Sequence, residues 1–191
     1  MPKPTRGEQK RRLILETTLR LIASNGVDSV THRRVAEAAK IPLGSTTYYF
    51  ESREHLLRET FLHYIDDVRE QHARFSAKLD SRSVTAMVDL LVELTEWEFE
   101  NENRMLAEYE LTLYAARDPI VAEHLHAWDD GTLHQLAEAL LELGAADPED
   151  GAVSILHLLR GYELDRLSRH QSSSESLRRR LRTIVTALCD A

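Results

Sequence analysis

The sequence is poor in the residues that build disulfide-rich, membrane-spanning or β-rich proteins. Cys189 is the one cysteine among 191 residues, which excludes a disulfide framework and a thiolate zinc site. No apolar run approaches the ~20 residues that a membrane-spanning helix needs. Glycine and proline are scarce and aromatic residues make up only 6% of the chain, so the composition favours helices over sheets. The basic start MPKPTRGEQKRR is followed by no apolar segment, so we expect a cytoplasmic protein without a secretory signal.

The charge is unevenly distributed between the two ends of the chain. Residues 1–55 hold ten Lys and Arg against six Asp and Glu, a net charge of +4. The remainder holds 14 against 26, a net charge of −12, so the whole chain carries −8. A basic N-terminal part on an acidic body indicates a polyanion-binding end.

Apolar residues recur with the 3.6-residue period of a helix along almost the whole chain, and no strand-like alternation competes. Asp118 and Asp147, each followed by proline, mark helix starts because aspartate is a favoured N-cap and proline a favoured first residue. Gly26 and Gly144 mark helix ends. The polar loop before the last helix offers Ser172 for a capping box. The expected fold class is all-α with about nine helices, at about 8–24, 32–39, 44–49, from 53, 83–100, 103–117, 119–143, 148–169 and from 173.

Two of these helices are short and follow a longer one, which is the order of a helix-turn-helix. Small inward residues such as Ala36 and Ala39 allow the two helices to cross closely, and Pro42 interrupts the chain between them. The second helix carries the stretch GSTTYY, with five hydroxyl groups on one or two turns. Hydroxyls bond both base edges and phosphate oxygens, so this stretch suits a duplex groove.

Two further features of this region favour DNA. Gly44 lets the backbone at the start of the second helix approach a phosphate closely. The flanking cations supply a salt-dependent attraction that does not depend on sequence. These cations are Arg33, Arg34, Lys40 and Arg53.

Residues 8 to about 62 resemble the DNA-binding head of the tetracycline-repressor (TetR) family. That head has a helix ending in glycine, a threonine opening the second helix, a Gly-(Ser/Thr) start to the recognition helix, a tyrosine pair and a phenylalanine. This sequence reads SNGVDSVTHRRVAEAAKIPLGSTTYYFESREHLL. It departs from the pattern at four positions: Lys40 replaces the usual turn glycine, Thr47 a frequent tyrosine, Tyr49 a common histidine and Arg53 a lysine.

The resemblance implies a DNA-binding domain over residues 1–52, with its helix-turn-helix at about 30–50, and a ligand-binding and dimerisation domain over 53–191. It implies phosphate contacts by Thr31, Arg33, Tyr48 or Tyr49, and Arg53. It implies base contacts by Leu43, Ser45, and Thr46 or Thr47. With the flanking groups, the full predicted DNA-binding set is Thr31, Arg33, Arg34, Leu43, Gly44, Ser45, Thr46, Thr47, Tyr48, Tyr49 and Arg53.

By the same resemblance, the last two helices would pair with those of a second chain in a four-helix bundle. Their apolar stripes fit this role, and a glycine permits close approach. A two-fold homodimer predicts an inverted-repeat operator with recognition helices roughly 34–36 Å apart. The alternative is that both stripes pack within their own domain. The predicted interface residues are Ile155, Leu156, Leu159, Gly161, Tyr162, Leu177, Leu181, Ile184, Val185 and Leu188.

The resemblance also places a small-molecule effector among the middle helices, where pockets are mostly apolar with a few polar groups. Glu98, Glu110 or His72 would orient the effector, and a buried carboxylate would favour a cation. Each apolar candidate has the alternative of an ordinary core residue. The predicted pocket residues are Tyr64, Val68, Met87, Leu91, Trp97, Met105, Tyr109 and Leu113.

The leading hypothesis is a one-component transcriptional regulator that binds DNA as a dimer and represses transcription. The effector releases the regulator from DNA; the sequence also allows an effector that promotes DNA binding. One alternative is a metal-binding bundle or an enzyme, because Glu123, His126 and His134 lie close in sequence. No second Glu-x-x-His, phosphate loop or nucleophile elbow accompanies them, so we expect no enzyme, metal or cofactor. The other alternative is a scaffold that binds only protein.

Overall fold

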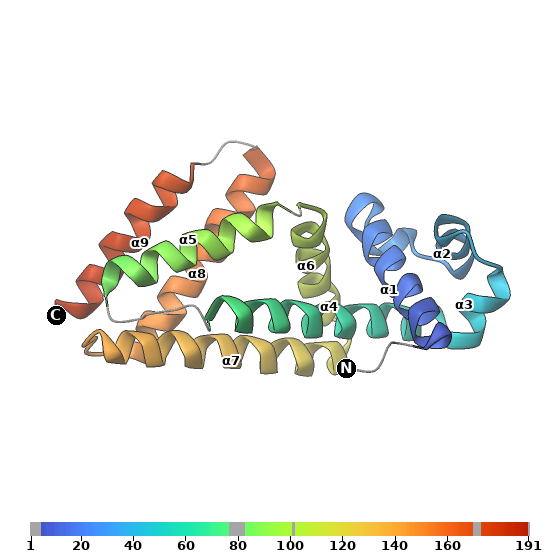
Figure 1. The fold of residues 1–191 in the computed structure, drawn as a ribbon, viewed down its shortest axis with the longest axis horizontal. Coiled ribbons are helices and arrows are strands. Elements are labelled where there is room, and N and C mark those ends of the chain that lie inside the picture. The colour runs from blue at the N-terminus through green and yellow to red at the C-terminus, as the bar shows by residue number, and fades with distance from the viewer. Residues whose placement is uncertain (1–4, 77–82, 101, 170–172, 191) are drawn as a thin grey trace. The chain divides into compact units, whose positions relative to one another are not determined.

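The computed structural model describes residues 5–76, 83–100, 102–169 and 173–190, and these residues are helical with no strand among them. The all-α prediction is therefore confirmed (Figure 1). The elements are α1 (Arg6–Asn25), the 3₁₀ turn η1 (Val27–Ser29), α2 (His32–Ala39), α3 (Leu43–Tyr49), α4 (Arg53–Ser76), α5 (Val84–Phe99), α6 (Glu102–Ala115), α7 (Pro119–Glu142), α8 (Pro148–Arg169) and α9 (Ser174–Cys189).

Local capping explains most helix ends. Asp118 accepts hydrogen bonds from the N–H groups of Ile120 and Val121, and Asp147 accepts one from Asp150, so both Asp-Pro starts are confirmed. The first helix begins earlier than predicted because Thr5 caps it in a capping box with Glu8. Ser172 lies outside the described residues, and the N-cap of α9 is Ser173.

The helices form two compact units. One, the N-terminal unit, contains residues 1–68 and 101–125, and the other, the C-terminal unit, contains 69–100 and 126–191. The N-terminal unit therefore joins α1 to α3 with the first part of α4 and with α6. The predicted functional boundary at residue 52 stays a prediction. None of the described helices is long and apolar enough to cross a membrane.

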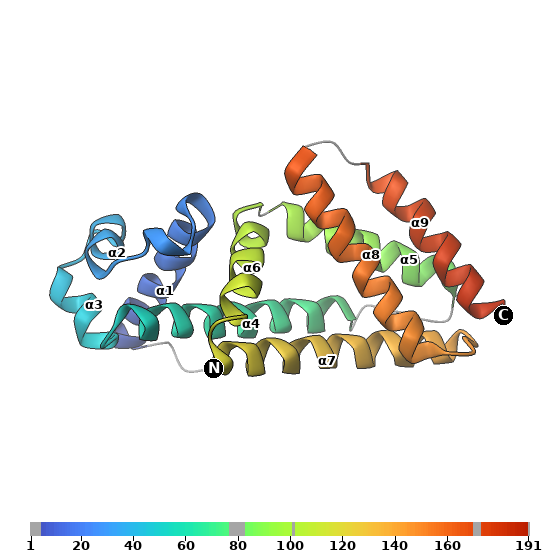
Figure 2. The ribbon, with the colours of Figure 1, turned by 180° about the vertical axis from the view of Figure 1, so that it is seen from behind.

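The core of the N-terminal unit holds the short helices in place. Phe50, Phe61 and Ile14 are completely buried, as is Val35 of α2. In both views α2 and α3 lie beside one another and next to α1 (Figures 1 and 2). The burial of Phe50, one residue after α3, fixes which face of that helix turns inward.

The C-terminal unit buries the apolar stripes of α8 and α9 against α5 and α7. A side chain at Gly151 would meet the side chains of Leu140 and Leu188 at 3.0 Å, so α8 crosses its neighbours closely there. Six of the ten predicted dimer residues lie in this core, which favours the alternative that the stripes pack within their own domain, and their part in a dimer interface stays a prediction. These six are Ile155, Leu159, Tyr162, Leu177, Leu181 and Val185.

Candidate nucleic-acid interface

The inward face of α3 is fixed by Thr46, whose side chain is fully buried. Its hydroxyl donates to the carbonyl oxygen of Leu43 at 2.8 Å and lies 3.4 Å from that of His32 in α2. The sequence predicts a base contact by Thr46 or Thr47, and the burial of Thr46 favours Thr47. The sequence carried a signal for this placement, because Thr46 lies four residues before Phe50 and so on the same helical face.

The outward face of α3 presents side chains that the fold leaves uncovered. Tyr48 is 81% exposed, Leu43 is 49% exposed and Thr47 is also exposed, whereas Ser45 is half-buried. Gly44 is exposed as well, and a Cβ built there would meet nothing within 4 Å. A partner can therefore approach the backbone of the first turn of α3 without displacing any part of the chain.

The two tyrosines have different surroundings. The hydroxyl oxygen of Tyr49 lies 3.5 Å from where a Cβ on Gly7 would be, so Tyr49 packs over the start of α1. Tyr48 meets the Tyr49 ring edge-on, with ring centroids 5.0 Å apart, and otherwise extends outward. Of the two, Tyr48 is the one presented for contact.

Three of the predicted cations form hydrogen bonds or an ion pair within the N-terminal unit. Arg53 donates to the carbonyl oxygens of Val30 at 2.9 Å and Val27 at 2.8 Å, so it braces the loop between α1 and α2. The phosphate contact of Arg53 stays a prediction, and it would be made by the guanidinium N–H groups that do not bond these two carbonyl oxygens. Arg34 donates to a backbone carbonyl in the same loop at 2.9 Å, and the exposed Arg33 pairs with Glu37 on its own helix. Thr31 is exposed and caps α2.

The sequence did not indicate that Glu110 of α6 contacts the loop between α1 and α2. Its carboxylate accepts a hydrogen bond from the N–H of Val27 at 3.3 Å, 83 residues away along the chain. The loop that precedes Thr31 is thus held by Glu110 through a backbone N–H and by Arg53 through two carbonyl groups. Spacing in the sequence cannot reveal a contact across such a distance.

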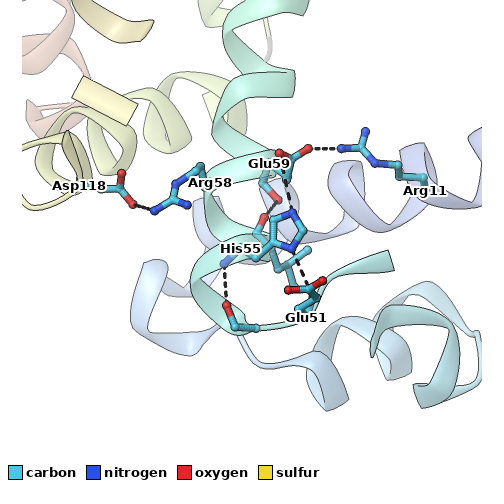
Figure 3. A network of polar contacts seen from close by, with 9 residues as sticks. Arg11, Glu51, His55, Arg58, Glu59 and Asp118 are labelled. Atoms are coloured by element: carbon cyan, nitrogen blue, oxygen red, sulfur yellow. Dashed lines mark hydrogen bonds and ion pairs between the residues drawn. The ribbon is translucent and has the colours of Figure 1, made fainter. Parts of the chain in front are cut away.

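A polar network fixes the first half of α4 (Figure 3). Arg11 of α1 pairs with Glu59, and His55 accepts a hydrogen bond from the Glu51 N–H at 3.3 Å. Arg58 donates to the buried Asp118 at 2.9 Å. Burial alone would raise the pKa of Asp118, but the hydrogen bonds from Arg58 and from two backbone N–H groups outweigh it and lower that pKa.

The predicted pocket residues fall in both units. Tyr64, Val68 and Met105 are buried in the N-terminal unit, where Tyr109 is half-buried, while Met87, Leu91 and the half-buried Trp97 belong to the C-terminal unit. Met87 and Leu91 lie in the core beside α8 and α9, which is the ordinary core alternative. Leu113 is 67% exposed, which does not favour a place inside a closed pocket, and its assignment stays a prediction.

Two carboxylates of the body are nevertheless sheltered. The Tyr64 hydroxyl donates to Glu108 at 2.5 Å in the N-terminal unit. In the C-terminal unit, Glu98 lies 2.9 Å from the ring of His72, and both side chains are less than one fifth exposed. The His72 ring is also 5.9 Å from that of the buried Trp128.

Among the described residues, no group of three or more His, Cys, Asp and Glu side chains could hold a metal ion. Glu123, His126 and His134 are all exposed on α7. Their closeness in sequence therefore does not produce a metal site in this part of the chain.

Two family models match the chain. Residues 14–60 match bacterial regulatory proteins of the tetR family, and residues 81–191 match the tetracyclin repressor-like C-terminal domain. The HTH-type transcriptional regulator BetI of Burkholderia lata is 34% identical over 85 residues, which is 44% of this chain and 44% of BetI. The chain thus aligns with less than half the length of this relative.

Solved structures match over nearly the whole chain. A TetR-family member from Streptomyces coelicolor A3 is 26% identical with a TM-score of 0.75, covering 92% of this chain and 98% of that one. The multidrug binding protein EbrR in complex with ethidium is 28% identical with a TM-score of 0.66, covering 92% and 98%. EbrR has also been solved with imidazole.

Proposed function

Because the chain belongs to the TetR family of bacterial regulatory proteins, we propose that it represses transcription by inserting α3 into the major groove of an operator. One observation carries this proposal: α3 buries Thr46 and leaves Leu43, Thr47 and Tyr48 without cover. A seven-residue helix that served only packing would not need large side chains at these positions.

The exposed groups divide between base and phosphate contacts. Leu43 and Thr47 lie four residues apart on the outward face, where an apolar group meets a thymine methyl and a hydroxyl meets a base edge. Tyr48 and Thr31 have hydroxyls that donate to phosphate oxygens, and Arg33 exchanges a weak surface ion pair for a phosphate. Gly44 allows the backbone to come near the duplex.

The regulator acts as a homodimer formed by the outward faces of α8 and α9. Gly161 and the half-exposed Leu164 share one face of α8, and a side chain at Gly161 would meet nothing within 4 Å. Arg179 and Arg182 are exposed on α9, so charges contribute beside the apolar contact. Two-fold pairing presents two copies of α3 to an inverted repeat.

The effector is an organic cation. EbrR, which shares the fold at 28% identity, has been solved with ethidium, a planar cation. In the C-terminal unit of this chain, the sheltered carboxylate of Glu98 stabilises positive charge better than an exposed one does, because the local dielectric is lower. The effector releases the operator by binding more tightly to a conformation in which the two heads no longer fit it.

Selection of bound fragments from genomic DNA tests the proposal. The purified protein is mixed with sheared DNA, bound fragments are sequenced, and affinity for the best fragment is compared with that for a scrambled one. We expect salt-dependent binding with at least ~10³-fold preference for the selected fragment. Equal affinity for both fragments would refute the proposal and would favour the protein-only scaffold.

A further inference from the structure

Lys40 adopts a backbone conformation that disfavours lysine. Among the described residues other than glycine, it alone has a positive φ, of 54°. It ends α2 in the left-handed region, and its N–H bonds back to the carbonyl groups of Ala36 and Glu37. Glycine reaches this conformation without steric cost, whereas a residue with a Cβ does not. For the backbone of this turn, lysine is therefore less favourable than glycine.

The cations around the helix-turn-helix differ in the contacts that they make within the chain. Arg34 and Arg53 donate to backbone carbonyl groups, and Arg33 pairs with Glu37. The side chain of Lys40 is exposed, and no hydrogen bond or ion pair joins its ammonium group to any described residue. Of the four cations around the helix-turn-helix, Lys40 is the one that makes no hydrogen bond or ion pair with a described residue.

Lys40 lies close to the start of α3 along the chain. It lies three residues before Leu43, a span of at most about 11 Å, and its four-carbon side chain extends further. A duplex carries one negative charge per ~1.7 Å of its axis. When α3 lies in the groove, phosphate oxygens therefore fall within reach of the ammonium group.

We propose that Lys40 contacts a DNA phosphate beside the base pairs that α3 reads, and that the turn after α2 presents its ammonium group there. The inference rests on the proposed function, since it requires α3 to enter the groove. A phosphate contact adds affinity that depends on salt but not on base sequence.

Three variants separate the charge from the backbone. Lys40→Gln removes the charge and keeps a side chain on the strained backbone, Lys40→Gly removes both, and Lys40→Arg keeps the charge. The affinity of each for the selected fragment is measured from 50 to 200 mM salt. The slope of log K against log salt is negative, and loss of one phosphate contact makes it shallower by about 0.9 per chain. This corresponds to roughly eightfold lower affinity per chain at ~0.1 M salt.

We expect Lys40→Gln and Lys40→Gly to show that loss and Lys40→Arg to bind like the wild type. All three keep the preference for the selected over the scrambled fragment. The melting temperature of Lys40→Gly is equal to that of the wild type or up to about 4 °C higher, so weaker binding cannot come from unfolding. Arg117→Gln, which removes an exposed cation from the turn after α6, serves as the control with an unchanged slope.

A wild-type slope for Lys40→Gln would overturn this inference and leave the proposed function intact. A wild-type protein that binds the selected and scrambled fragments equally would instead refute the proposed function, and this inference with it.

Discussion

The N-terminal unit and the C-terminal unit use their helices in opposite ways. In the N-terminal unit, α3 buries Thr46 and presents most of its large side chains outward. In the C-terminal unit, α8 and α9 bury their apolar stripes in their own core. An apolar stripe at helical spacing is explained by the fold of one chain, whereas several exposed groups gathered on one face of a short helix offer a surface for a partner. The second kind of residue is therefore the better guide to function.

The largest expected effect comes from removing the anchor of α3. Phe50→Ala should lower the free energy of unfolding by about 3–5 kcal/mol, because a completely buried ring leaves a cavity behind. Tyr48→Ala, two residues earlier, should change it by no more than about 0.5 kcal/mol. Urea denaturation followed by circular dichroism measures both, and similar losses would show that the outward face also serves the fold.

The proposed dimer interface gives the next effect. Leu164→Arg should raise the dimer dissociation constant by at least ~10-fold, because burial of a leucine contributes about 1.5–3 kcal/mol. Leu141→Arg, at an exposed leucine of α7 in the same unit, is the matched control and should have no effect. Sedimentation velocity distinguishes the two. Equal behaviour of the variants would remove this face of α8 from the interface, and a monomeric wild type would refute the dimer.

The Asp118–Arg58 pair predicts a pH dependence of stability. Because the pKa of Asp118 is lowered below its ordinary value of 3.8, its ionised form stabilises the fold fully above about pH 4, and this stability is lost as the pH falls through the lowered pKa. Asp118→Asn should cost about 1.5 kcal/mol at pH 7 and little at low pH.

Thermal unfolding between pH 7 and pH 3 checks this expectation. Glu138→Gln is the control, because Glu138 pairs with His134 on the exposed surface of α7 and should leave the pH profile unchanged. A constant difference between wild type and Asp118→Asn across this range would show that the charge of Asp118 is not what stabilises the fold.

The two neighbouring threonines of α3 compare its inward and outward faces one residue at a time. Thr46→Val should lower stability by about 1 kcal/mol, because it removes a buried hydroxyl that bonds a carbonyl group of its own helix. Thr47→Val should leave stability unchanged and weaken preference for the selected fragment by about 1–3 kcal/mol. Urea denaturation and fluorescence anisotropy with labelled DNA measure the two effects, and an exchange of roles would contradict the assigned faces.

The sequence predicted the helices well because their ends depend on neighbouring residues. The bounds 32–39 and 148–169 agree with α2 and α8, where Thr31 and Asp147 act as local caps. The face of α3 was predictable in part, since the spacing from Thr46 to Phe50 places both inward. Contacts between distant segments were not predictable: the bond from Val27 to Glu110 depends on how α6 packs.

The same limit applies to the stripes of α8 and α9. Periodicity shows that Leu177 and Leu181 share an apolar face but not which surface covers that face, since a partner chain and the chain's own core have the same hydrophobic character. The exposure of Leu113 was not predictable for the same reason: the sequence of a helix does not show whether an apolar side chain lines a pocket or faces solvent.

Hydrogen–deuterium exchange on adding the selected DNA fragment tests the central claim most directly. If the outward face of α3 enters the duplex, peptides covering residues 40–50 should gain protection, while those covering 173–190 should not. Protection confined to the C-terminal unit, or none over α3 while the DNA is bound, would contradict the account.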